Sequence, residues 1–299
     1  MSPKLTQIKT SDGLTLPGMI YEIPNSTKAA IYLHGNGTTS VFYSMDKHDA
    51  LAKALTEKGI SYLPFNNRGA HVAKTLKVRK NGTVEKKSFG TAYEIIKESV
   101  YDIDGAIAFL QDKGYSEFYL IGESTGANKI CVYNHYRSKN PVSKYILLSG
   151  SDDTGIYYHM LGKEKFFNLL KEAKEKVDQG DGEELIKNAP ELDIYSYQGF
   201  YDIANPDGDY NVFPYYEVLH NLKLSKKPLF GYFKAITKPT LVVYGEFDEF
   251  AWGNVPKVID ILKQQRQTCA YEIIEGADHS FTGHYDALAK TIGAWLERQ

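Results

Sequence analysis

The sequence predicts an α/β domain in which a predominantly parallel central sheet is flanked by helices. Short runs of β-branched and aromatic residues recur along the chain, and segments with apolar residues at three- and four-residue spacing lie between them. Glycine, proline or polar residues separate the two kinds of segment. Strands that alternate with helices in this way imply right-handed crossovers and a sheet covered by helices.

Six short apolar runs are the predicted strands of this sheet. Each is almost continuously apolar, which is typical of parallel strands buried on both faces. They span residues 29–33, 60–63, 117–121, 144–148, 240–244 and 269–274. The first 23 residues, with a turn at residues 10–13, predict an antiparallel hairpin on one edge of the sheet.

Five amphipathic segments are the predicted covering helices. The helical spacing is clearest at Val100, Ile103, Ile107 and Leu110, which recur every three or four positions. The segments span residues 46–58, 92–113, 128–138, 255–265 and 285–298.

Two further segments interrupt the alternation. In residues 68–90, Asn81-Gly82 between basic residues predicts a surface hairpin with a type I′ turn. This hairpin is either a solvated excursion or a contact for an anionic substrate or a partner. In residues 151–236 the strand pattern stops, and helical pieces at 163–179 and 183–187 accompany an aromatic stretch.

We therefore predict an inserted cap at residues 151–236 and a core domain made of residues 1–150 and 237–299. The aromatic residues of the cap form either its own small core or a pocket for an acyl or aryl group.

Charge and composition exclude several classes of function. The 35 Lys and Arg against 37 Asp and Glu give a net charge of −2, which removes the electrostatic case for binding nucleic acid. No window approaches the roughly 18 continuous apolar residues of a membrane span, and the start of the chain does not resemble a signal peptide. We expect a cytoplasmic protein. Its two cysteines lack the spacing of a zinc site, so we expect no metal.

The pentapeptide Gly122-Glu123-Ser124-Thr125-Gly126 directly follows one predicted strand and precedes a helix. In this setting the serine must occupy a sharp, strained turn, and the flanking glycines leave room where a Cβ would strike a neighbouring element. The hydroxyl is then directed above the carboxyl edge of the sheet. A serine at an ordinary tight turn or helix N-cap is the alternative interpretation.

A nucleophilic serine needs a histidine base and an acid that orients the base. Asp248 follows the predicted strand 240–244, and His279 follows the strand 269–274. Because the carboxyl ends of parallel strands lie at one edge of a sheet, Ser124, Asp248 and His279 can converge there.

Each of these two positions has a rival. Asp152 and Asp153 follow the predicted strand 144–148 and could supply the acid. His284 lies five residues beyond His279, although it resembles the start of the last helix.

The order of these motifs resembles that of the α/β-hydrolase superfamily over nearly the whole chain. The motifs are His34-Gly35-Asn36-Gly37, the Ser124 pentapeptide, the Tyr-Gly-Glu-Phe-Asp that ends at Asp248, and the Gly-Ala-Asp-His-Ser-Phe around His279. A weaker resemblance extends to siderophore-esterase-related and feruloyl-esterase-like groups. The resemblance implies an α/β-hydrolase fold with an inserted cap.

The same resemblance implies a function and a set of roles. Ser124 would be the nucleophile, Asp248 the orienting acid and His279 the general base, with backbone N–H groups of Asn36 and Thr125 as the oxyanion hole. The implied activity is hydrolysis of a small-molecule carboxylic ester through an acyl-enzyme, without a metal or organic cofactor. The alternatives are a catalytically silent relative that binds a small ligand or a partner, and an acyltransferase or thioesterase that uses the same residues.

Overall fold

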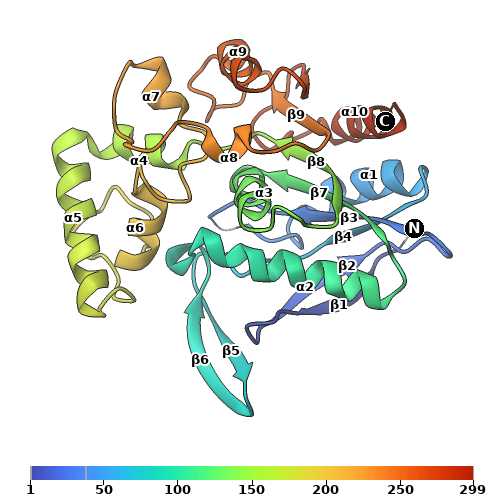
Figure 1. Ribbon diagram of the computed structural model, residues 1–299, viewed down its shortest axis with the longest axis horizontal. Coiled ribbons are helices and arrows are strands. Elements are labelled where there is room, and N and C mark those ends of the chain that lie inside the picture. The colour runs from blue at the N-terminus through green and yellow to red at the C-terminus, as the bar shows by residue number, and fades with distance from the viewer. Residues whose placement is uncertain (1, 38, 299) are drawn as a thin grey trace.

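The computed structural model describes residues 2–37 and 39–298, and a parallel sheet of six strands lies at its centre (Figure 1). Every neighbouring pair in this sheet is parallel, in the order β10-β9-β8-β7-β3-β4. The predicted fold class is therefore confirmed. The strands are β3 (Lys28–Leu33), β4 (Ile60–Pro64), β7 (Glu117–Glu123), β8 (Val142–Leu148), β9 (Thr240–Gly245) and β10 (Ala270–Ile274).

Helices cover both faces of the sheet, and two apolar clusters mark the two faces. Along β7, Leu120 packs into the cluster that contains residues of α2, α3 and α9, whereas Ile121 packs into the cluster of α1 and α10. This alternation follows from the period of two in a strand. The helices are α1 (Met45–Thr56), α2 (Ser99–Asp112), α3 (Thr125–Tyr136), α9 (Val255–Gln265) and α10 (Tyr285–Glu297). Among the described residues, none of the helices combines the length and apolar character that crossing a membrane requires.

The helix predicted at residues 92–113 begins later than expected. Two short 3₁₀ turns, η1 (Thr91–Tyr93) and η2 (Ile96–Glu98), precede α2. Glu94 between them is extended, with φ −71° and ψ 132°. Its side chain is buried, and the Ile96 N–H donates to Asp202 Oδ2 at 2.7 Å. Contacts with the later segment of the chain therefore override the local preference for helix in these first residues.

The predicted N-terminal hairpin is present and lies at the edge of the sheet. Strands β1 (Lys4–Lys9) and β2 (Thr15–Ile20) form their own antiparallel pair. Tyr21 then makes an antiparallel bridge to Tyr62 of β4, which is the edge strand of the central sheet.

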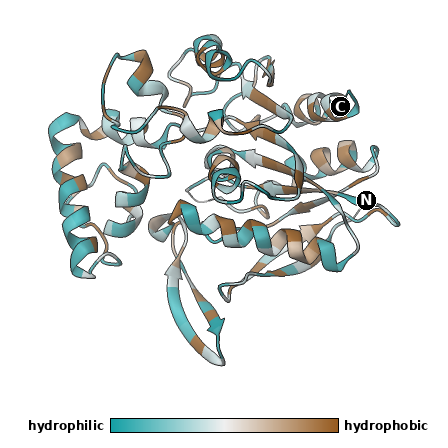
Figure 2. Cartoon of the chain, viewed as in Figure 1, coloured by the Kyte–Doolittle hydropathy of each residue, from teal (hydrophilic) through white to brown (hydrophobic). Residues whose placement is uncertain are grey.

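The second predicted hairpin is also present. Strands β5 (Lys74–Lys80) and β6 (Thr83–Phe89) are antiparallel and joined by Asn81-Gly82. Both turn residues have positive φ, 51° and 78°, as a type I′ turn requires. The hairpin projects from the body of the molecule and is mostly hydrophilic (Figures 1 and 2). Its two predicted roles, a solvated excursion or a contact for an anionic substrate or a partner, both stay predictions.

The segment between β8 and β9 is about half helical and lies beside the sheet (Figure 1). Many of its aromatic side chains, among them Phe200, Phe213 and Tyr215, are buried in the same cluster as α2 and α3. They therefore form a core that is continuous with the main domain. The helices of the segment are α4 (Asp153–Leu161), α5 (Lys163–Gln179), α6 (Tyr197–Ala204), α7 (Tyr215–Leu219) and α8 (Gly231–Lys234).

One predicted helix in this segment, residues 183–187, is wrong. Leu185 instead makes an isolated antiparallel bridge to Ser196, and the Ile186 N–H donates to the Tyr195 carbonyl at 2.9 Å. So short a stretch gains little from helical hydrogen bonds, and pairing with the chain at residues 195–196 satisfies its backbone instead.

Candidate active site

Ser124 lies at the turn from β7 into α3, in a conformation that side chains rarely adopt. Its φ is 56° and its ψ −129°. The turn is held because the Ser124 N–H donates to the Leu148 carbonyl at 2.8 Å and the Ser124 carbonyl accepts from the Ala127 N–H at 2.9 Å. Ser124 is only partly buried, and in the described chain its side chain makes no capping hydrogen bond to α3. A strained residue that the surrounding backbone holds in place is characteristic of functional sites.

Close packing explains the glycines around this turn. A Cβ on Gly122 would lie 2.3 Å from the carbonyl oxygen of Gly126, and a Cβ on Gly126 would lie 2.1 Å from that of Leu33. A Cβ on Gly35 would lie 2.8 Å from Ser124 Cβ. The loop after β3 therefore packs directly against Ser124, and the predicted reason for the flanking glycines is confirmed.

Asp248 and His279 are joined directly. His279 Nδ1 lies 2.8 Å from Asp248 Oδ1, which also accepts from the Phe250 N–H at 3.0 Å. Both residues are nearly buried, with exposed fractions of 2% and 7%. Since a carboxylate accepts hydrogen bonds, Nδ1 carries the proton, and Nε2 of a neutral His279 is free to accept one.

Backbone hydrogen bonds join the loop that carries Asp248 to the loop that carries His279. The Glu246 N–H donates to the Ile274 carbonyl at 2.9 Å, and the Phe247 N–H donates to the Ala277 carbonyl at 2.8 Å. The His279 N–H donates to Glu249 Oε2 at 3.1 Å. The loops after β9 and β10 thus form one unit at the carboxyl edge of the sheet.

The electrostatic surroundings raise the pKa of His279. Burial alone would lower the pKa, but the hydrogen bond and the charge of Asp248 outweigh it, and the charges of Glu123 and Glu249 add to the rise. Burial raises the pKa of Asp153 to about 6, and the charge of His279 acts in the opposite direction. The imidazole of His279 also lies in the electric field of Glu123, the residue that precedes Ser124.

The alternative residues for the acid and the base have other hydrogen-bond partners. Asp152 caps α4 by accepting from the Gly155 N–H at 3.0 Å. Asp153 accepts from Ser151 Oγ at 2.9 Å and from Thr125 Oγ1 at 3.2 Å. His284 is the residue at the N-cap of α10, with Nδ1 3.0 Å from the Thr282 carbonyl oxygen. The structure thus pairs the His279 ring with Asp248.

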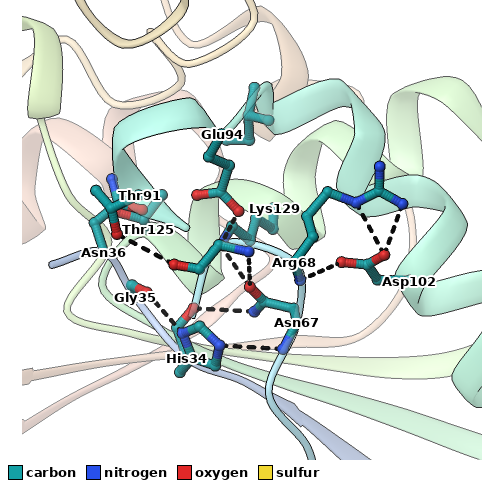
Figure 3. A network of polar contacts seen from close by, with 12 residues as sticks. His34, Gly35, Asn36, Asn67, Arg68, Thr91, Glu94, Asp102, Thr125 and Lys129 are labelled. Carbon is teal, nitrogen blue, oxygen red and sulfur yellow. Dashed lines mark hydrogen bonds and ion pairs between the residues drawn. The ribbon is translucent and has the colours of Figure 1, made fainter. Parts of the chain in front are cut away.

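The loop that contains Asn36 is held by a buried network (Figure 3). His34 Nε2 accepts from the Asn67 N–H at 3.1 Å, so Nδ1 carries the proton and donates to the Gly35 carbonyl at 2.8 Å. Burial, together with the charge of Lys129, holds the pKa of His34 well below its ordinary value, so this ring stays neutral. Its two hydrogen bonds hold the start of the loop in place.

Thr125, the other predicted oxyanion residue, is the first residue of α3. The N–H groups of a first helical turn lack acceptors inside the helix and lie at the positive end of its dipole.

Two buried ion pairs near the site were not predicted. Glu123, next to Ser124, pairs with Lys47 of α1 at 2.7 and 2.8 Å and accepts from the Tyr32 hydroxyl at 2.9 Å. Glu94 pairs with Lys129 of α3 at 2.7 Å. For Lys129 the sequence signal was a single charge beside the apolar run Ile130-Cys131-Val132, whereas Lys47 lies among charged and polar residues and gave no signal.

The described part of the chain contains no group of three or more His, Cys, Asp and Glu side chains that could hold a metal ion. Cys131 and Cys269 are both free and buried. Burial raises the pKa of each thiol, so both remain protonated and act as packing residues.

The architecture and the strand-turn-helix setting of Ser124 define the α/β-hydrolase fold, and solved structures match it over almost the whole chain. Est1E from Butyrivibrio proteoclasticus, solved with ferulic acid bound, has a TM-score of 0.63 and 16% identity, with 98% of each chain covered. The α/β-hydrolase GrgF from Penicillium sp. sh18 has a TM-score of 0.64 and 14% identity, with 100% and 99% covered. The esterase Pf2001 from Pyrococcus furiosus has a TM-score of 0.57 and 18% identity, with 99% and 91% covered. At these identities the similarity establishes the fold.

The family can also be stated. A family model described as "Protein of unknown function (DUF1749)" matches residues 85–297, and the chain belongs to this family. No curated protein matches the sequence.

Proposed function

We propose that the protein is a serine hydrolase that cleaves carboxylic esters through an acyl-enzyme on Ser124. The observation that carries the proposal is the buried 2.8 Å contact between His279 and Asp248, on loops that share the sheet edge with the strained Ser124 turn. These are the three groups that an alcohol nucleophile requires, in the chain order of the α/β-hydrolase fold.

The mechanism that we infer uses these three groups in the order of a serine hydrolase. Neutral His279 removes the hydroxyl proton through Nε2 as Ser124 Oγ attacks the ester carbonyl. The resulting oxyanion accepts hydrogen bonds from the backbone N–H groups of Asn36 and Thr125, and Asp248 stabilises the imidazolium. His279 then donates its proton to the departing alcohol, and water repeats the sequence on the acyl-enzyme.

The test is hydrolysis of p-nitrophenyl esters with acyl chains from acetate to palmitate, with methyl ferulate as an aromatic ester. The aromatic ester is included because Est1E was solved with ferulic acid bound. Turnover that requires Ser124 supports the proposal, and the preferred acyl group reports how long an acyl chain the site accepts. A folded protein that binds these esters without turnover would favour a ligand-binding role. Product partitioning that depends on added alcohol would favour acyl transfer.

The pH dependence of kcat/KM is a further expected result. The base must be neutral, so activity rises with pH as His279 loses its proton. Because the His279 pKa is raised, the midpoint of this acid limb is expected above 6.5. A pH series with one p-nitrophenyl ester measures it.

Asp153→Asn is the control for this pH series, because burial raises the Asp153 pKa to about 6 and the Asp153 carboxyl interacts electrostatically with His279. We expect the limb to move only slightly in that variant. A midpoint below 6.5 in the wild type, or loss of the limb in Asp153→Asn, would contradict the assignment to His279.

A further inference from the structure

A tyrosine from the segment between β8 and β9 contacts the loop that contains Asn36. The hydroxyl of Tyr210 lies 3.1 Å from Asn36 Oδ1 and 2.9 Å from Glu94 Oε2. Tyr210 itself is almost completely buried, with an exposed fraction of 2%. A phenol needs hydrogen-bond partners when it is buried, and here Asn36 and Glu94 supply them.

The carboxylate of Glu94 is a rigid anchor for this hydroxyl. Glu94 Oε1 pairs with Lys129 Nζ at 2.7 Å, and both side chains are almost fully buried. Lys129 also donates to Asn67 Oδ1 at 3.2 Å (Figure 3). Breaking a buried ion pair leaves an uncompensated charge in the interior, so this pair holds its geometry. The second oxygen of Glu94 is therefore fixed in place for Tyr210.

The Asn36 side chain is held by its contact with the Tyr210 hydroxyl. Its Nδ2 atom is buried and has no hydrogen-bond partner among the described residues, whereas Oδ1 accepts from Tyr210. The oxygen and nitrogen of an amide exchange places by a half-turn of the side chain. The phenol of Tyr210 has one hydrogen, so it cannot donate to Asn36 Oδ1 and to Glu94 Oε2 at the same time. With the amide exchanged, Tyr210 donates to Glu94 and accepts from Asn36 Nδ2, which then has a partner. In this orientation Tyr210 links Asn36 to the Glu94–Lys129 ion pair.

The backbone around Tyr210 also contacts the helix that starts at Thr125. The side-chain amide of Asn128 on α3 donates to the Ser151 carbonyl at 2.8 Å and to the Tyr210 carbonyl at 3.4 Å. Tyr210 therefore lies between Asn36 and α3, the two elements that supply the proposed oxyanion donors.

We propose that Tyr210 is a positioning residue that holds Asn36 so that its backbone N–H points at the developing oxyanion. The oxyanion hole is then complete only when the segment between β8 and β9 packs against the loop that contains Asn36. This inference rests on the proposed ester hydrolysis. The oxyanion forms only after attack by Ser124, so a displaced Asn36 slows turnover and leaves substrate binding nearly unchanged.

Tyr210→Phe removes the hydroxyl and keeps the ring, and Tyr195→Phe is the matched control. Tyr195 is also buried in this segment, and its hydroxyl contacts that of Tyr157 at 2.7 Å. We expect Tyr210→Phe to lower kcat about 10-fold, the equivalent of about one hydrogen bond, with KM nearly unchanged. Inhibition by a trifluoromethyl ketone, which forms a tetrahedral oxyanion adduct with a serine, should weaken by a similar factor. Tyr195→Phe should change neither quantity.

Asn36→Ala, which keeps the backbone N–H, tests whether Tyr210 acts through Asn36. If it does, adding Tyr210→Phe to Asn36→Ala lowers kcat no further. Fully additive losses, or equal losses in Tyr210→Phe and Tyr195→Phe, would overturn the inference.

Hydrogen exchange of a peptide that covers residues 34–37 gives a readout independent of turnover. We expect faster exchange in Tyr210→Phe than in Tyr195→Phe, because the loop loses an anchor. Unchanged exchange overturns the positioning role of Tyr210 even if the wild type hydrolyses no ester. Absence of ester hydrolysis by the wild type overturns the proposed function instead, so the two failures are distinguishable.

Discussion

Replacing Ser124 with alanine is expected to lower kcat for ester hydrolysis by about 10⁶-fold, because loss of a nucleophile removes the covalent route. The folded state should persist, because the Ser124 side chain is partly exposed and makes no cap hydrogen bond to α3 in the described chain. Steady-state kinetics and thermal unfolding of the same preparation measure both quantities.

Ser280→Ala is the matched control for this substitution. Ser280 is also partly buried and directly follows His279, but it lies outside the Ser124 turn. We expect its kcat to stay within about threefold of the wild type, because the Ser280 hydroxyl has no part in the proposed chemistry. Equal activity in wild type and Ser124→Ala would show that hydrolysis uses a different group.

Asp248→Asn is expected to lower kcat by about 10⁴-fold, the size of loss that this change causes in a serine protease triad. An amide cannot stabilise the imidazolium as a carboxylate does, and it can pair with His279 in the wrong tautomer.

The pH profile of Asp248→Asn should change as well. Without the charge of Asp248, burial dominates and lowers the His279 pKa, so the acid limb should move toward lower pH.

Asp278→Asn separates the role of Asp248 from a general loss of negative charge near the base. Asp278 precedes His279 and accepts from the Thr282 N–H at 2.8 Å, a contact within its own loop. We expect a small change in kcat and an unmoved acid limb. A larger loss from Asp152→Asn or Asp153→Asn than from Asp248→Asn would assign the acid to the loop after β8.

The sheet and the location of the candidate site residues at its edge were predictable because both depend on local patterns. A buried parallel strand is continuously apolar, and a residue just beyond such a strand must lie at the carboxyl edge of the sheet. Ser124, Asp248 and His279 each follow such a strand, so their location needed no knowledge of distant contacts. The turn at Asn81-Gly82 was predictable for a similar reason, since its two positive φ angles suit those residue types.

The predictions that were wrong or missing concern residues whose structure depends on contacts with distant parts of the chain. Residues 92–98 lack the expected helix because Asp202 binds the Ile96 N–H, and this acceptor lies 106 positions away in the chain. Lys47 and Glu123 are 76 positions apart, and Glu94 and Tyr210 are 116 apart. No periodicity within one window carries information about such pairs. A lone charge in an apolar stretch marks Glu94, but it does not identify the partner, and Lys47 lies among charged and polar residues that give no such signal.

The contact of Tyr210 with Glu94 and Asn36 bears on how this chain could be shortened or recombined. A chimera that replaced residues 151–236 with the corresponding piece of another α/β-hydrolase would leave a buried carboxylate and a buried amide without their phenol. We expect such a graft to lose turnover as Tyr210→Phe does, unless the incoming piece supplied a hydroxyl at the same place or Glu94 and Lys129 were exchanged with it. Exchanging the piece thus calls for matched changes in the core, which couples the segment between β8 and β9 of this chain to its proposed oxyanion hole.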